Sequence, residues 1–305
     1  MRRGTYSIVA RDPASGELGV AVQSHWFGVG AVVAWARPGV GAVATQSVAE
    51  IAHGPDTLAG LERGLGAREA LDAVLAADEL ARFRQVGVVD ARGAVAAHTG
   101  EGSIAHAGDV HGDGFACQAN MMAAPGVPEA MADAFLAAGG AGEGDLAERM
   151  LSALDAAEGA GGDVRGRQSA ALLVVPGRGE PWRARFDVRV EDHSDPLGEL
   201  RRLVRLARAY EMAGEADELA ARGAASDAAR LYVAASALAP ESDELVFWAG
   251  LGAAADDIDA GAELVRRAIA AAPGWRTLLD RLSGELAPTA AAVRDALERP
   301  PGGRG

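Results

Sequence analysis

The run Gly4-Thr-Tyr-Ser-Ile-Val-Ala-Arg-Asp12 is followed, after a short linker, by the run Gly19-Val-Ala-Val-Gln-Ser24. Both runs are rich in strand-forming residues, and the first alternates in polarity, so they predict two strands. The linker Pro13-Ala-Ser-Gly-Glu17 has turn chemistry, because Pro sets φ and Gly permits a positive φ. Strands this close in the chain pair as an antiparallel hairpin, since parallel neighbours need a long crossover. The stretch therefore predicts an antiparallel sheet with the first strand inside it.

Thr5 heads the first strand, directly after Gly4. If the residues before it were removed, Thr5 would carry a free α-amine beside its own hydroxyl. One residue would then supply both the nucleophile and the base for attack on an amide carbonyl. The structural alternative is a threonine chosen for its β-propensity alone.

Composition narrows the classes of function. The 305 residues carry a formal net charge of −14, so nucleic acid and anionic membrane surfaces are poor partners. All 29 basic residues are arginine, so no lysine can act as a base or a phosphate-binding cation. The single cysteine, Cys117, excludes an internal disulfide and favours a buried thiol. The sequence has neither a membrane-spanning run nor an apolar signal core, so we expect a cytoplasmic protein.

The order of expected elements over residues 5–190 is strands, two helices, strands, two helices, strands. This order suits an α+β fold in which antiparallel sheets lie inside and helices outside. The run Gly39-Val-Gly-Ala-Val-Ala44 matches a dinucleotide-binding pattern, but that pattern must open a helix. Because its residues alternate like a strand after a Pro-Gly turn, we interpret it as a strand.

Beyond about residue 195 the chain is almost entirely helical. Alanine-rich segments end at Pro240 and Pro273, a spacing close to the tetratricopeptide period. We therefore expect a first domain over residues 1–195, a helical TPR-like domain over 196–290 and a disordered tail over 291–305.

Several segments resemble the Ntn-hydrolase-like family of unknown function DUF1028, and the resemblance covers roughly residues 5–205. They are Thr5-Tyr-Ser-Ile-Val-Ala-Arg-Asp, Gly19-Val-Ala-Val-Gln-Ser, Trp35-Ala-Arg-Pro-Gly-Val-Gly-Ala-Val-Ala-Thr-Gln46, Gln85-Val-Gly-Val-Val-Asp90, Gln118-Ala-Asn-Met-Met122 and Gly166-Arg-Gln-Ser-Ala-Ala-Leu-Leu-Val174.

This resemblance implies a four-layer α-β-β-α sandwich with Thr5 at the position of the nucleophile. The element order is also similar to that of proteasome β-subunits, but the catalytic lysine of those proteins cannot exist here. Family members tend to begin Met-Thr, so Met1-Arg-Arg-Gly4 is either removed or reflects an upstream start codon.

Polar residues at expected strand ends are the candidate site. Asn120 could donate to an oxyanion, and Arg167 is the cation best placed to take over the role of a lysine. We expect both to converge with Gln46 on the Thr5 hydroxyl, in a pocket open to solvent. In the structural alternative, the amide side chains only cap backbone groups at strand ends. Arg167 would then form an ion pair with Asp163 that stabilises the loop. The catalytic set is thus Thr5, Arg167 and Asn120, and the substrate-binding set is Ser24, His25, Gln46, Asp163, Gln168 and Ser169.

The leading functional hypothesis is an amidohydrolase acting on a small amide or ureido compound, without a cofactor. The alternative is a non-catalytic descendant of the same fold, which binds a ligand or serves as a scaffold. A metal site around His106 and His111 is disfavoured by their spacing and the intervening glycine. A peptidoglycan-associated role is disfavoured by the lack of an export signal. We also expect a homo-oligomer, with the helical segment free to dock a protein partner.

Overall fold

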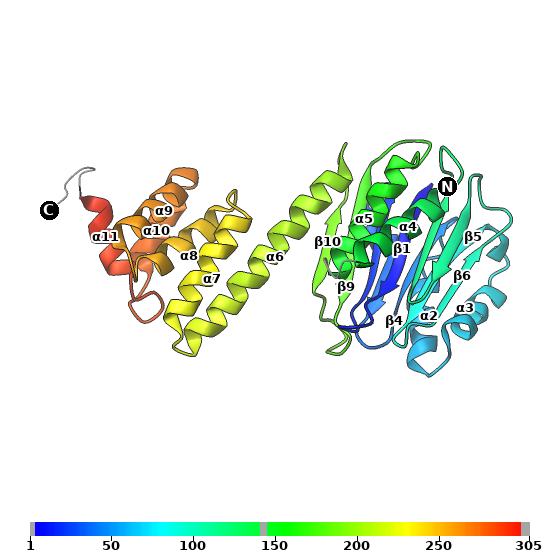
Figure 1. Ribbon diagram of the computed structural model, residues 1–305, viewed down its shortest axis with the longest axis horizontal. Coiled ribbons are helices and arrows are strands. Elements are labelled where there is room, and N and C mark those ends of the chain that lie inside the picture. Colours follow the sequence, from blue (N-terminus) through cyan, green and yellow to red (C-terminus); the bar gives the residue numbers. More distant parts are fainter. Residues whose placement is uncertain (1–3, 141–144, 300–305) are drawn as a thin grey trace. The chain divides into compact units, whose positions relative to one another are not determined.

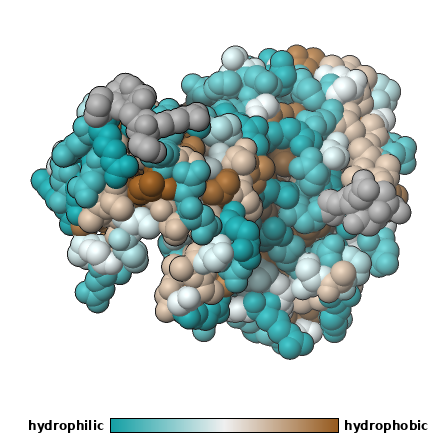
Figure 2. All heavy atoms as spheres, turned by 60° about the vertical axis from the view of Figure 1, so that its left-hand side comes forward, coloured by the Kyte–Doolittle hydropathy of each residue, from teal (hydrophilic) through white to brown (hydrophobic). Residues whose placement is uncertain are grey.

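The computed structural model describes residues 4–140 and 145–299 and divides into two compact units, Met1–Arg201 and Arg202–Gly305. The division falls within helix α6 (Pro196–Ala221), whereas we expected it at residue 195. Removal of Met1–Gly4 would free the amine of Thr5. Of these four residues, Met1–Arg3 lie outside the described residues. The surface drawn in Figure 2 is mostly hydrophilic, in keeping with the net charge of −14.

The larger sheet of the first unit has six strands in the order β10-β9-β2-β1-β8-β7, and every neighbouring pair is antiparallel. The predicted hairpin is confirmed, since Thr5 pairs with Ser24 across it and with Asn120 on the other side. Thr5 therefore lies in a central strand, where both neighbours fix its backbone. The strands are β1 (Thr5–Arg11), β2 (Leu18–Ser24), β7 (Gly108–Gly112), β8 (Phe115–Asn120), β9 (Ser169–Val175) and β10 (Phe186–Val190).

The smaller sheet has four antiparallel strands in the order β3-β4-β5-β6. Its second strand contains most of the glycine-rich run, so the interpretation of that run as a strand is confirmed. The strands are β3 (Ala34–Arg37), β4 (Gly41–Ser47), β5 (Arg84–Asp90) and β6 (Val95–Thr99).

Two helix pairs cover the sheets (Figure 1). Helices α4 (Val127–Gly140) and α5 (Leu146–Gly159) pack on the six-stranded sheet, and α2 (His53–Glu62) and α3 (Ala67–Ala76) pack on the other. The two sheets contact each other through β1, β4, β5 and β8. Two short helices, α1 (Gly30–Val33) and η1 (Ala81–Phe83), complete the unit.

Polarity changes along the space between the sheets. Alternate residues of β1 point there, and Val9 joins an apolar cluster with Val20 and Ala44. Toward the Thr5 end, the inward side chains are instead Thr5 and Ser7, which lie among buried amides. Because both faces of β1 are covered, its outward residue Tyr6 is buried as well and reaches Glu158 of α5.

The second unit is helical, as the composition predicted. Phe247 and Trp275 stack at 4.8 Å between ring centroids inside its apolar core. We expected disorder from residue 291, but residues 291–298 belong to an amphipathic helix on which Val293 and Ala296 are buried. Residues 300–305 lie outside the described residues. The helices after α6 are α7 (Ala225–Leu238), α8 (Asp243–Ala253), α9 (Ile258–Ala271), α10 (Gly274–Arg281) and α11 (Ala290–Glu298).

Within the two described ranges, no helix has the length and apolar character that crossing a membrane demands.

Candidate functional site

The Thr5 hydroxyl lies at the polar end of the space between the sheets. Its Oγ1 donates to Ser24 Oγ at 3.1 Å, and the Ser24 hydroxyl donates in turn to the carbonyl oxygen of Gly4. The hydroxyl of Thr5 is thus linked through one side chain to the peptide bond that precedes it. Thr5 is only 1% exposed, so the expectation of an open pocket at this hydroxyl is wrong.

The carbonyl oxygen of Gly4 has a second donor, Arg165, whose Nη2 lies at 2.9 Å. Two donors on one carbonyl oxygen, one of them a cation, polarise the carbonyl and would stabilise negative charge developing on it. Two donors therefore converge on the carbonyl oxygen of the Gly4–Thr5 peptide bond.

Asp163 holds this arrangement in place. Its buried carboxylate binds the Arg165 guanidinium at 2.7 and 3.1 Å and accepts from the backbone N–H groups of Arg165 and His25. The carboxylate also lies directly against Gly4, where a Cβ atom would come within 2.8 Å of it. Only glycine fits there without a shift, so Asp163 fixes both the cation and the residue before Thr5.

Amide side chains hold the other side of Thr5. Gln46 Nε2 and Asn120 Nδ2 lie 3.3 and 3.5 Å from the Thr5 carbonyl oxygen. Both also donate to Gln85 Oε1, at 2.8 and 3.0 Å. The structure therefore brings Gln46 and Asn120 to Thr5 as expected, but to its carbonyl oxygen rather than to its hydroxyl.

The network continues from Gln85 toward a cleft. Gln85 Nε2 donates to Thr99 Oγ1 at 2.9 Å, and Thr99 donates to Asp109 at 2.5 Å. Both Thr99 and Asp109 line a cleft of about 490 Å³ beside the start of α4. Hydrogen bonds thus connect the surface of the molecule to the Thr5 backbone, although the cleft does not reach Thr5.

The remaining expected residues lie apart from the Thr5 hydroxyl. Arg167 pairs with Asp195 at 3.1 Å and with Glu158 at 3.5 Å, and the preceding Gly166 adopts a positive φ. Gln168 donates to Asp192, and Ser169 donates to the backbone of Trp26 in the loop after β2. His25 contributes its backbone N–H to Asp163.

The predicted set of site residues omitted two central residues, Arg165 and Gln85. Arg165 lies two positions before the favoured Arg167, and alternation within a loop gives no basis for choosing between them. Gln85 carried a detectable signal, since it is a polar residue directly before the apolar run Val86-Gly-Val-Val89 in a buried strand.

The structure also locates Cys117 and the potential metal ligands of the described residues. Burial raises the pKa of Cys117 well above its usual range, so its thiol is a poor nucleophile. No group of three potential His, Cys, Asp or Glu ligands comes together among residues 4–140 and 145–299.

Comparisons with known proteins identify the family to which the first unit is related. The model of a family of unknown function, DUF1028, matches residues 5–200. The crystal structure of protein SPO2555 from Silicibacter pomeroyi, itself assigned to DUF1028, has a TM-score of 0.60 and 30% sequence identity. That likeness covers 67% of this chain and 89% of the other. The curated proteins contain no significant match. Over residues 5–200, and therefore over most of its length, this chain belongs to the family of unknown function DUF1028.

Proposed function

We propose that this protein is an N-terminal nucleophile amidohydrolase that acts on a small amide or ureido substrate through Thr5. The observation that carries the proposal is the pair of donors, Arg165 and Ser24, on the carbonyl oxygen next to the Thr5 hydroxyl. Two facing antiparallel sheets between two helix pairs support it, because that arrangement is what the resemblance to Ntn hydrolases implies.

In the proposal, the first step releases Thr5. The Oγ atom of Thr5 attacks the Gly4 carbonyl carbon, the C–N bond breaks, and the hydroxyl proton passes to the departing amine. Arg165 and Ser24 stabilise the charge on the carbonyl oxygen during the attack. Water then hydrolyses the resulting ester, which leaves the Gly4 carboxylate and a free Thr5 amine. The free amine then serves as the general base, a role that no lysine can take in this chain.

Release of Gly4 also vacates the position that a substrate acyl group needs. The substrate carbonyl oxygen would take the place of the Gly4 oxygen between the same two donors. The Thr5 amine would accept the hydroxyl proton and deliver it to the leaving nitrogen. Because Ser24 and Asp163 are buried and only Arg165 is partly exposed, the vacated space admits a small acyl group rather than a polypeptide.

Intact-mass measurement of the purified full chain tests the first step. We expect a species that begins at Thr5, and we expect Thr5→Ala to retain Gly4 and to lose hydrolysis of a panel of small amides and ureides. Thr5→Ser should retain a fraction of both, since it keeps a hydroxyl. Circular dichroism shows whether each variant is folded.

Arg165→Gln and Arg167→Gln form a matched pair, because both are loop arginines paired with carboxylates. Loss of an oxyanion donor costs about 10²–10³-fold in rate, so Arg165→Gln should slow cleavage and turnover by that order. Arg167→Gln should change both much less. Two results together would overturn the proposal. The wild-type chain would retain Gly4, and neither Arg165→Gln nor Arg167→Gln would change the rate of amide or ureide hydrolysis.

The near-complete burial of Thr5 favours a second candidate, a non-catalytic ligand-binding or scaffolding protein with this fold. It predicts a mass that still includes Gly4, and ligand binding that Thr5→Ala leaves unchanged.

A further inference from the structure

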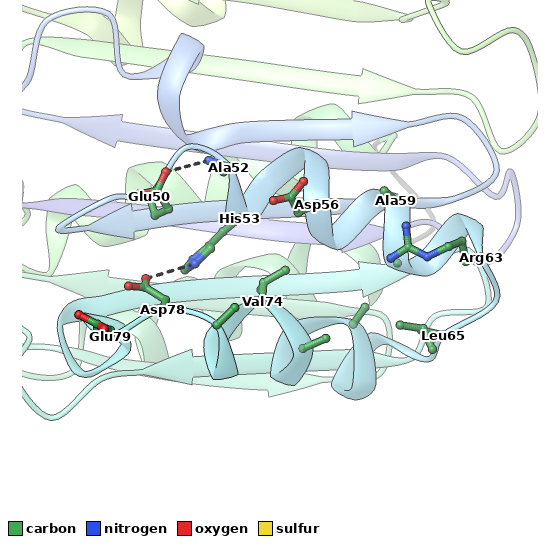
Figure 3. Close-up of a pocket in the computed structure, with 14 residues that line it drawn as sticks. Glu50, Ala52, His53, Asp56, Ala59, Arg63, Leu65, Val74, Asp78 and Glu79 are labelled. Atoms are coloured by element: carbon green, nitrogen blue, oxygen red, sulfur yellow. Dashed lines mark hydrogen bonds and ion pairs between the residues drawn. The ribbon is translucent and has the colours of Figure 1, made fainter.

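A groove of about 520 Å³ runs between α2 and α3, on the outer side of the four-stranded sheet, and includes none of the residues around Thr5 (Figure 3). Its middle is lined by small or apolar residues, among them Ala59, Gly60 and Val74. This α2–α3 groove therefore has an apolar floor that suits an alkyl chain.

The two ends of the groove carry opposite charges. Glu50, Asp78 and Glu79 lie at the end where α2 begins and α3 stops, Asp56 lies further along α2, and Arg63 lies at the other end (Figure 3). Asp78 and Glu50 are partly neutralised by the buried Arg84. Asp56, Glu79 and Arg63 form no ion pair with any residue in the described ranges, so their charges are available to a ligand.

His53 adds an unsatisfied polar group at the acidic end. Its side chain is only 5% exposed, and its Nε2 lies 3.3 Å from Asp78 Oδ2. Its Nδ1 is buried and has no hydrogen-bond partner among the described residues. Burial lowers the pKa of His53, so at neutral pH the ring is uncharged. With the proton on Nε2 facing Asp78, Nδ1 is an acceptor that a ligand N–H group would satisfy.

We propose that the α2–α3 groove binds an ω-amino carboxylate, a small zwitterion whose ammonium and carboxylate groups are separated by an alkyl chain. The ammonium lies beside Asp56 and His53, with Glu79 adding negative charge at the same end of the groove, and the carboxylate pairs with Arg63. Asp56 and Arg63 are seven residues apart on one helix, which separates their Cα atoms by roughly 10 Å. A ligand of about the length of ε-aminocaproate spans that distance once the side chains reach inward. This site lies beyond the proposed hydrolase function and does not depend on it.

Calorimetric titration of the full chain tests the proposal with three related probes. We expect ε-aminocaproate to bind more tightly than hexylamine or caproate, because each of those retains only one charged end. Binding of ε-aminocaproate should be equal in wild type and Thr5→Ala, which separates this site from the proposed hydrolytic centre.

Matched variants assign the two ends. Asp56→Asn with Glu79→Gln should weaken ε-aminocaproate and hexylamine by roughly five- to tenfold and leave caproate unchanged. Arg63→Gln should weaken ε-aminocaproate and caproate instead. The controls Asp72→Asn and Arg68→Gln remove exposed α3 charges outside the groove and should change nothing. The proposal is overturned if folded wild type gives no heat with millimolar ε-aminocaproate, or if the groove variants bind it as wild type does.

Discussion

Gly4 shows at the scale of one residue how tightly the Thr5 centre is built. An added methyl group would meet the buried Asp163 carboxylate at 2.8 Å. In the Thr5→Ala background, which is expected to retain Gly4, we expect Gly4→Ala to lower the free energy of unfolding by about 1–3 kcal/mol, the usual cost of overpacking. Urea denaturation measures this difference. Gly108→Ala is the control, because a Cβ atom there meets nothing within 4 Å, and an equal loss in both variants would contradict the argument.

His53 gives stability a pH dependence. Burial lowers the folded-state pKa of His53 below the ordinary 6.5. The nearby Asp78, Glu50 and Asp56 act in the opposite direction, and Arg84 adds to the lowering. Well above pH 6.5 the ring is neutral in both states and contributes nothing to the slope. As the pH falls below 6.5, the unfolded chain gains a proton that folded His53 binds more weakly, so the free energy of unfolding decreases.

His53→Gln should therefore flatten the change in urea midpoint between about pH 7.5 and about pH 5.5. His111→Gln, at a side chain that is 58% exposed, is the control and should leave the slope as in wild type. A slope that survives His53→Gln would assign the pH dependence to other groups.

At the scale of elements, Gln85 joins the two sheets. It accepts from Gln46 and Asn120 and donates to the Ala119 carbonyl oxygen of β8. Gln85→Met keeps the volume but leaves buried polar groups without a partner, so it should lower the free energy of unfolding by about 1–3 kcal/mol.

Gln168→Met serves as the comparison, since Gln168 donates to Asp192 in an exposed pair, and its effect should stay within about 0.5 kcal/mol. Chemical denaturation of both variants gives the answer, and equal effects would show that the inter-sheet network adds nothing.

Some turns between strands can be predicted from the sequence pattern and others cannot. Residues 112–120 hold the end of β7, a turn and β8, because Gly114 adopts a positive φ and reverses the chain. Glycines at strand ends and at true reversals look alike in sequence, so the pattern of residues does not separate β7 from β8. The first hairpin was predicted correctly because Pro13 and Gly16 stand between two long apolar runs.

For the whole molecule, the division into two units predicts separable stability. A fragment of residues 1–201 should fold, because both sheets and all four covering helices lie within it. We expect a cooperative thermal transition and the far-ultraviolet dichroism of a mixed α/β protein. A fragment that shows no cooperative transition would mean that the first unit needs the second.

The sequence by itself determined the antiparallel hairpin, the central place of Thr5, the family and the helical second part. These follow from local periodicity, turn residues and motifs, which are written into short stretches of chain. Tertiary structure alone decided that Arg165 rather than Arg167 reaches Gly4, and that Gln46 and Asn120 meet at Gln85. It also decided that Asp56 and Arg63 face one groove with Glu79. Such meetings depend on loop conformation and on how separate elements pack, and neither is encoded by the spacing of residues in any one segment.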